Sequence, residues 1–193
     1  MHRTSIDARI RIALTQLIVD EWRLVSSTER DRAGTANEVA VAFALGWHLK
    51  PLVDRRWDVD CEYNRATDAA GDSDVKRRSG GNRVYPDLLI HRRRERGPEN
   101  NLLVLELKTN SSSQTHRGGS QATVADVVEL NGYQHGVFLD LKISGQSMDP
   151  HWAWYQPAQG VVAGTWSARR RIYSAQSRDA LVARAKAEAD MRY

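Results

Sequence analysis

The sequence predicts an α/β protein, and three observations support this fold class. Residues 84–90 and 101–108 are apolar runs bounded by polar loops, which is typical of two buried strands. A third apolar run covers 137–143, and a helical pattern over 123–134 separates it from the second. A strand, a helix and a strand in succession imply a right-handed crossover and a parallel pair of strands. We therefore expect a sheet with helices packed against it.

The other elements follow from hydrophobic periodicity. Residues 5–25 carry apolar side chains at helical spacing, and 35–49 are nearly all apolar, as in a helix buried against a sheet. This second helix should end before Pro51, since a proline disfavours the helical conformation of the residue before it. Residues 57–63 alternate apolar and acidic side chains, as a half-buried strand does. We also expect long polar loops over 64–83 and 109–121, a fifth strand over 152–155, a turn or short strand over 160–165, and a helix over 177–191.

Composition limits the class of protein. The chain has 193 residues, of which 41% are hydrophobic and 27% charged, as expected of one globular domain over 1–193. No apolar run approaches the roughly 20 residues that a membrane-spanning helix needs. The lone Cys61 excludes an internal disulfide framework and a multi-cysteine zinc site, so we expect a cytoplasmic protein. The net charge of +4 permits nucleic-acid binding.

Charged side chains in the two buried strands are the main indication of function. Alternation along 101–108 places Glu106 and Lys108 on one face, and Asp87 follows Pro86 at the start of the neighbouring strand. Two carboxylates on adjacent strands can bind a hard divalent cation, and a lysine about 6–7 Å further along the same face can polarise a water molecule. The alternative is an ion pair of Glu106 and Lys108 on an edge strand, worth under about 1 kcal/mol.

The pair Pro86-Asp87, followed after residues 88–105 by Glu106-Leu107-Lys108, resembles the signature of the PD-(D/E)xK nuclease superfamily. The resemblance implies a restriction-endonuclease-like fold: three α/β/α layers with a central mixed sheet of four to five strands. The family-like core would cover about 35–143. The helix over 5–25 and a C-terminal extension over 157–193 would be additions.

The resemblance also implies an activity, the hydrolysis of phosphodiester bonds in nucleic acid, DNA above all. Asp87, Glu106 and the backbone carbonyl of Leu107 would bind Mg²⁺ or Mn²⁺, and Lys108 would position or activate the attacking water. Glu38, on the helix before the sheet, would be an outer or second-metal ligand. Residues 35–38 also fit a capping box, which is the structural alternative for Glu38.

Basic residues are the candidates for phosphate contacts. The runs Lys76-Arg77-Arg78 and Arg92-Arg93-Arg94 flank the Asp87 strand, and Arg117 lies in the loop after Lys108. Such runs are otherwise solvated surface. The expected partner is nucleic acid and not a membrane, and a homodimer is left open. Two other interpretations remain: a non-catalytic DNA-binding or scaffold module of the same fold, and an unrelated α/β interaction protein.

Overall fold

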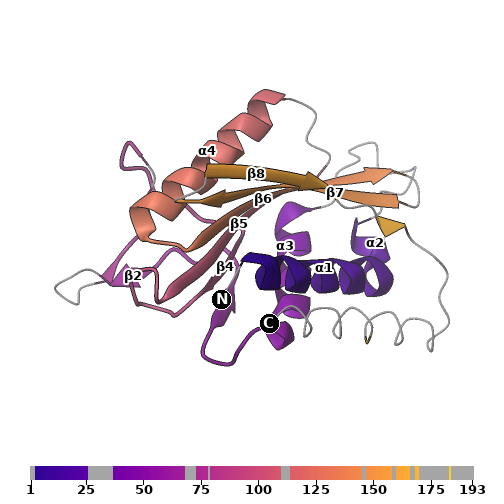
Figure 1. Cartoon of the computed structure of the whole chain (residues 1–193), viewed down its shortest axis with the longest axis horizontal. Coiled ribbons are helices and arrows are strands. Elements are labelled where there is room, and N and C mark those ends of the chain that lie inside the picture. The colour runs from indigo at the N-terminus through magenta and orange to yellow at the C-terminus, as the bar shows by residue number, and fades with distance from the viewer. Residues whose placement is uncertain are drawn as a thin grey trace.

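The apolar run that contains Glu106 forms β5 (Asn101–Thr109), an interior strand of the main sheet. The computed structural model describes residues 3–25, 37–67, 73–77, 79–109, 114–144, 147–157, 160–165, 168–169 and 183. Within these residues the chain has an α/β fold with a mixed sheet, as the sequence predicts (Figure 1).

The main sheet has the order β1-β4-β5-β6-β7-β8, and β9 lies off this path, paired with the start of β7. Its other strands are β1 (Asp58–Asp60), β4 (Leu88–His91), β6 (His135–Ser144), β7 (Ser147–Gln156), β8 (Gly160–Thr165) and β9 (Ala168–Arg169). Among the described strands only β5 and β6 pair in parallel, and α4 (Gln114–Asn131) connects them, which confirms the expected parallel pair with a helix between its strands. The five expected strands are present as β1 and β4 to β7, and residues 160–165 form a sixth.

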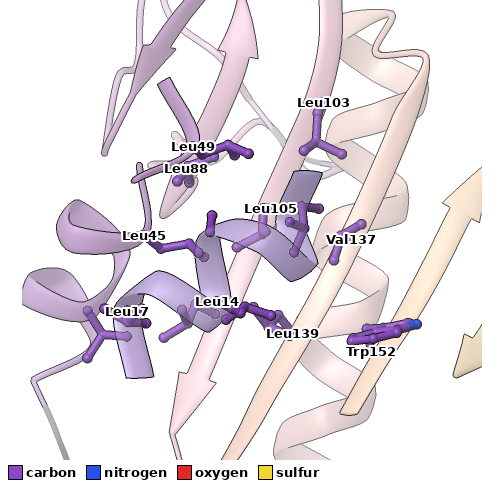
Figure 2. Packing of buried hydrophobic residues seen from close by; sticks show 14 of the residues in the cluster. Leu14, Leu17, Leu45, Leu49, Leu88, Leu103, Leu105, Val137, Leu139 and Trp152 are labelled. Atoms are coloured by element: carbon purple, nitrogen blue, oxygen red, sulfur yellow. The ribbon is translucent and has the colours of Figure 1, made fainter. Parts of the chain in front are cut away.

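The larger hydrophobic core lies between one face of this sheet and the N-terminal helices, α1 (Arg3–Asp20), α2 (Trp22–Val25) and α3 (Glu38–Leu49). Figure 2 shows Leu14 of α1 and Leu45 of α3 packed toward Leu105 and Leu139 of the sheet. All four side chains are fully buried. Burial of a leucine contributes about 1.5–3 kcal/mol, so the burial of Leu45 helps to hold α3 on the sheet.

The smaller core lies on the opposite face, beneath α4. Val124, Val127 and Val128 of the helix pack with Val104 and Phe138 of the sheet. The fit is tight, because the helix crosses β6 at a glycine. A Cβ atom at Gly136 would lie 2.5 Å from Val124 Cγ1 and 2.7 Å from Val128 Cγ2.

Several helix boundaries differ from the sequence prediction. The first helix breaks at Glu21 into α1 and α2, and α3 begins at Glu38 instead of residue 35. Asn37 is its N-cap, with Oδ1 accepting from the backbone N–H groups of Val39 (3.1 Å) and Ala40 (3.3 Å). The helix is also not buried all round. Three large side chains at positions 39, 43 and 47 are exposed, because only one face of α3 contacts the sheet.

The described residues of the expected loops include regular elements. Residues 64–83 contain a short antiparallel pair, β2 (Ala66–Thr67) and β3 (Ser73–Asp74), and a 3₁₀ turn, η1 (Lys50–Leu52), follows α3. The loop after β5 is shorter than predicted, since α4 begins at Gln114. The first strand ends at Asp60 instead of residue 63, because Glu62 has a φ of 49°, outside the extended region. The helix expected over 177–191 lies outside the described residues, apart from residue 183.

Candidate active site

Asp87 lies at the point where β4 begins, beside the C-terminal half of β5. β4 pairs with β5 from Leu88, whose partner is Leu105, so the backbone of Leu107 lies beyond the last pair. The Asp87 carboxylate takes the place of a strand partner there: its Oδ2 accepts a hydrogen bond from the Leu107 N–H at 2.6 Å. In a strand the N–H and C=O of one residue point to the same side. The carbonyl oxygen of Leu107 therefore faces the same edge as Asp87.

Glu106 and Lys108 project from the face of β5 opposite to Leu105 and Leu107, which lie in the larger core. The two charged side chains keep 18% and 28% of their surface exposed. Their Nζ and Oε1 atoms are 3.8 Å apart. β5 is an interior strand of the sheet, but β4 ends opposite Leu105, so at Glu106 and Lys108 the strand is paired with β6 alone. The alternative of an ion pair on an edge strand therefore remains.

Glu38 reaches the same place from the first residue of α3. Its Oε2 lies 3.0 Å from Lys108 Nζ, and its Oε1 accepts from the Thr109 N–H at 3.0 Å. The capping-box alternative is wrong, since Asn37 caps the helix and Glu38 bonds to β5 instead of its own helix. The structure thus brings Asp87, Glu106, Lys108 and Glu38 together at the C-terminal end of β5.

The carboxylates of this site are electrostatically unfavourable in the absence of a cation. Burial raises the pKa of Glu106 to about 7, and the charges of Asp87 and Glu38 add to the rise, while Lys108 opposes it. Burial also raises the pKa of Asp87 despite the Leu107 hydrogen bond and the Lys108 charge, and Glu38 and Glu62 contribute repulsion. An ion that neutralises the pair would relieve both effects.

Lys108 is held in its charged form. Partial burial opposes its charge, but the hydrogen bond to Glu38 and the charges of Asp87 and Glu106 outweigh burial and raise its pKa. Lys108 is therefore an ammonium at neutral pH. It can donate hydrogen bonds and offset negative charge, but it cannot accept a proton.

The oxygen atoms at this site suit a hard divalent cation, although they would form only part of its coordination shell. Asp87, Glu106 and the Leu107 carbonyl offer only oxygen, which Mg²⁺ and Mn²⁺ prefer, and Mg²⁺ commonly uses one or two carboxylates and keeps several waters. Among the residues that the structure describes, no three His, Cys, Asp or Glu side chains form a ready-made metal group. Both oxygens of Glu38 are already bonded to protein donors. Glu38 therefore fits a role in holding Lys108 better than a role as direct ligand.

The first basic run differs from the expectation of an exposed cluster. Lys76 is 2% exposed, and its Nζ donates to the Arg65 carbonyl at 2.5 Å. Arg77 is exposed and donates to the Gly81 carbonyl at 2.7 Å. Arg78, and the side chain of Arg117, lie outside the described part of the chain. Of this run, Arg77 alone among the described residues can meet a phosphate backbone at the surface.

In the second basic run, Arg92-Arg93-Arg94, two of the three arginines already bond to protein groups. Arg93 forms a two-point ion pair with Asp60, with Nε–Oδ2 at 2.8 Å and Nη2–Oδ1 at 2.5 Å. Burial raises the pKa of Asp60, but hydrogen bonds from Arg93 and His91 outweigh burial and hold that pKa well below its ordinary value. Arg92 Nη1 donates to Asn100 Oδ1 at 3.3 Å, whereas Arg94 is exposed. Arg93 therefore has a structural partner that the run of three arginines did not indicate.

Sequence reasoning missed one acid near the site. Glu62 lies close enough for its charge to raise the pKa of Asp87, and its backbone N–H donates to the Pro86 carbonyl at 3.0 Å. The sequence showed Glu62 only as an outward acid of an alternating strand. Nothing in the sequence indicates the left-handed backbone conformation of Glu62, which ends that strand.

Comparisons with protein-family models, with curated proteins and with solved structures find no match to this chain. Among the described helices, none is both long and apolar enough to cross a membrane.

Proposed function

We propose that this protein is a metal-dependent nuclease that hydrolyses phosphodiester bonds in DNA. The observation that carries the proposal is the convergence of Asp87, Glu106 and Lys108 with the Leu107 carbonyl at the end of a buried strand. Helices pack on both faces of a mixed sheet, which is compatible with a three-layer, restriction-endonuclease-like fold.

Asp87, Glu106 and the Leu107 carbonyl would hold Mg²⁺ or Mn²⁺. When bound, the ion would supply Lewis acidity toward the phosphate and a more acidic water. The Leu107 N–H holds Asp87 in place through Oδ2. The pKa of Glu106 is raised to about 7, and a bound cation would favour the ionised carboxylate.

Lys108 would stabilise the charge that develops on phosphate oxygens and orient the attacking water. Its pKa is raised, so it acts as a donor and a fixed positive charge. Glu38 holds its Nζ at 3.0 Å and thereby limits the rotamers of a long, flexible side chain. Glu38 is thus a positioning residue for Lys108.

The exposed arginines Arg77 and Arg94 would contact the phosphate backbone outside the site. Each phosphate contact lowers the slope of log K against log salt by about 0.9. Arg93 would contribute less, because Asp60 already neutralises it.

A second candidate is a non-catalytic nucleic-acid-binding module of the same fold. It is favoured by one observation: Glu38 and Lys108 already satisfy each other without any ligand. In that case the cluster would hold α3 against β5 and would take part in no reaction.

Cleavage assays on plasmid, linear, branched and single-stranded DNA separate the two candidates. The nuclease should cleave with Mg²⁺ or Mn²⁺ and remain inactive in EDTA, and Ca²⁺ should support binding without efficient turnover. Asp87→Asn should be inactive, while Glu99→Gln, a change in an exposed acid of the β4–β5 loop, should retain activity. Cleavage undiminished in EDTA would rule out the proposed mechanism. DNA binding without cleavage under any of these conditions would favour the non-catalytic module.

A further inference from the structure

An antiparallel hairpin leads directly into the candidate active site. It covers residues 76–84, which the structure describes apart from residue 78, and Arg77 pairs with Arg83 across it. Tyr85 follows the hairpin, and Asp87 comes two residues later. An extended chain spans at most about 3.6 Å per residue, so the Cα atom of Tyr85 lies within about 7 Å of the Cα atom of Asp87, and that of Arg83 within about 14 Å. The hairpin is therefore adjacent to the proposed metal ligands.

The hairpin is fixed to the body of the protein. Asn64, which is 7% exposed, joins its two strands: Oδ1 accepts from the Lys76 N–H at 2.6 Å, and Nδ2 donates to the Val84 carbonyl at 2.5 Å. Near the tip, the Ser79 N–H donates to Oδ2 of Asp126 on α4 at 3.3 Å. A surface that is held in this way loses little conformational freedom when a ligand binds to it.

Arg77 and Arg83 bring two positive charges to the same face of the hairpin. Residues directly opposite each other in an antiparallel pair lie on one face, about 5 Å apart, and both arginines are exposed. Nη1 of Arg77 donates to the Gly81 carbonyl, but no carboxylate of a described residue forms an ion pair with either arginine. Like charges at opposite positions are destabilising. An anion bound between the two guanidinium groups would remove this repulsion.

Tyr85 places an aromatic ring beside these arginines. It is 54% exposed, whereas the residues on either side of it, Val84 and Pro86, are buried. This alternation puts Arg83 and Tyr85 on the same, outward side of the segment. An exposed ring can stack on a nucleobase where the face of that base is free, as it is in a single strand.

We propose that Arg77, Arg83 and Tyr85 form a subsite for unpaired nucleotides beside the scissile phosphate. The two arginines bind a backbone phosphate, and the ring of Tyr85 stacks on an unpaired base. This inference rests on the proposed nuclease function and narrows its substrate to DNA with a single-stranded segment, either a single strand or a branched duplex. The observation that carries it is the position of two unpaired guanidinium groups and an exposed ring within a few residues of Asp87.

Binding is measured in EDTA by fluorescence anisotropy, so cleavage is not needed as a readout. The ligands are a short single-stranded deoxyoligonucleotide, an abasic oligonucleotide with the same number of phosphates, and a duplex of the same length. The variants are Tyr85→Ala, Tyr85→Phe and Arg83→Gln. The matched controls are Phe43→Ala, which removes another exposed ring, and Arg55→Gln, a change in an exposed arginine beyond the C-terminal end of α3.

The wild type should bind the single strand about tenfold more tightly than the abasic oligonucleotide, because its bases can stack. Tyr85→Ala should lose this preference and bind the abasic oligonucleotide and the duplex as the wild type does, whereas Tyr85→Phe should keep the preference. Arg83→Gln should keep the preference too, but its slope of log K against log salt for the single strand should be smaller by about 0.7. The two controls should behave as the wild type.

The inference is wrong if Tyr85→Ala keeps the wild-type preference for bases, if the salt slope of Arg83→Gln is unchanged, or if the wild type binds none of these ligands. Should Tyr85→Ala fail to fold, Tyr85→Leu, which keeps apolar bulk without a ring, decides the outcome. Cleavage with Mn²⁺, assayed separately, tests the nuclease itself. A protein that binds single strands through Tyr85 but never cleaves keeps the binding surface and refutes the nuclease. Binding and cleavage of single strands by Tyr85→Ala at wild-type levels would refute the subsite and retain the nuclease.

Discussion

Glu106→Gln should make the metal-free protein more stable near neutral pH. The glutamate is mostly buried beside Asp87, so its charged form is disfavoured in the folded state and its pKa rises to about 7. Glutamine keeps the shape of the side chain but has no charge to bury. The effect should depend on pH, because a protonated Glu106 resembles glutamine.

The magnitude follows from linkage between proton binding and folding. The pKa is about 7 in the folded protein against an ordinary value of 4.5, a difference of about 2.5, and each pKa unit corresponds to about 1.4 kcal/mol. Between these pH values the folded state binds more protons than the unfolded state, so stability falls as pH rises. The free energy of unfolding of the wild type, relative to Glu106→Gln, should decrease by about 3 kcal/mol from pH 4 to pH 8.

Urea unfolding of both proteins in EDTA, at half-unit steps across this range, measures the difference. Glu99→Gln, an exposed acid, serves as the control and should show no comparable trend. Adding Mn²⁺ at pH 7.5 should stabilise the wild type and have much less effect on the variant, because the ion binds the folded carboxylates. A difference between wild type and Glu106→Gln that stays constant from pH 4 to 8 would refute the electrostatic description of the site.

Two further predictions concern neighbouring parts of the fold. Asp87→Asn should abolish cleavage and most of the thermal stabilisation by Mn²⁺. In EDTA the variant should be as stable as the wild type or more so, since the change removes repulsion with Glu106. A clear loss of stability in EDTA, with no metal response in either protein, would make Asp87 a structural residue. Gly136→Ala should destabilise the protein by about 1–3 kcal/mol, because the new Cβ would clash with Val124 and Val128; an unchanged midpoint in urea would show that α4 can shift away from β6 without cost.

Much of the fold could be predicted because its central strands are unambiguous in sequence. Residues 102–108 are apolar apart from the charged side chains at 106 and 108, and a helix separates them from β6, so the parallel pair followed directly. The ends of the helices and strands were harder to predict. Glu62 carries no sequence signal for a positive φ, and the apolar composition of α3 could not show which of its faces meets the sheet, so the exposure of Phe43 and Trp47 was not predicted.

The candidate site was predictable where side chains lie on neighbouring strands. Asp87, Glu106 and Lys108 meet because strand alternation and hairpin pairing bring them together over short separations. The surroundings depend on tertiary contacts that no local pattern encodes. The ion pair of Arg93 with Asp60 and the burial of Lys76 join segments that are distant in sequence, so both residues looked like ordinary members of exposed basic runs.

The contacts of Glu38 link the integrity of the site to a slow, non-local event. This residue bonds to Lys108 and Thr109, 70 and 71 positions later in the chain, whereas Asp87 and Leu107 belong to one hairpin. Closing the longer loop costs more chain entropy, so the start of α3 should dock after the hairpin has formed and should be among the first parts to detach in local unfolding. The buried Thr109 amide, which is protected by Glu38, therefore exchanges its hydrogen only when this corner opens. Its exchange rate reports how often the folded protein, otherwise intact, leaves Lys108 without its positioning partner.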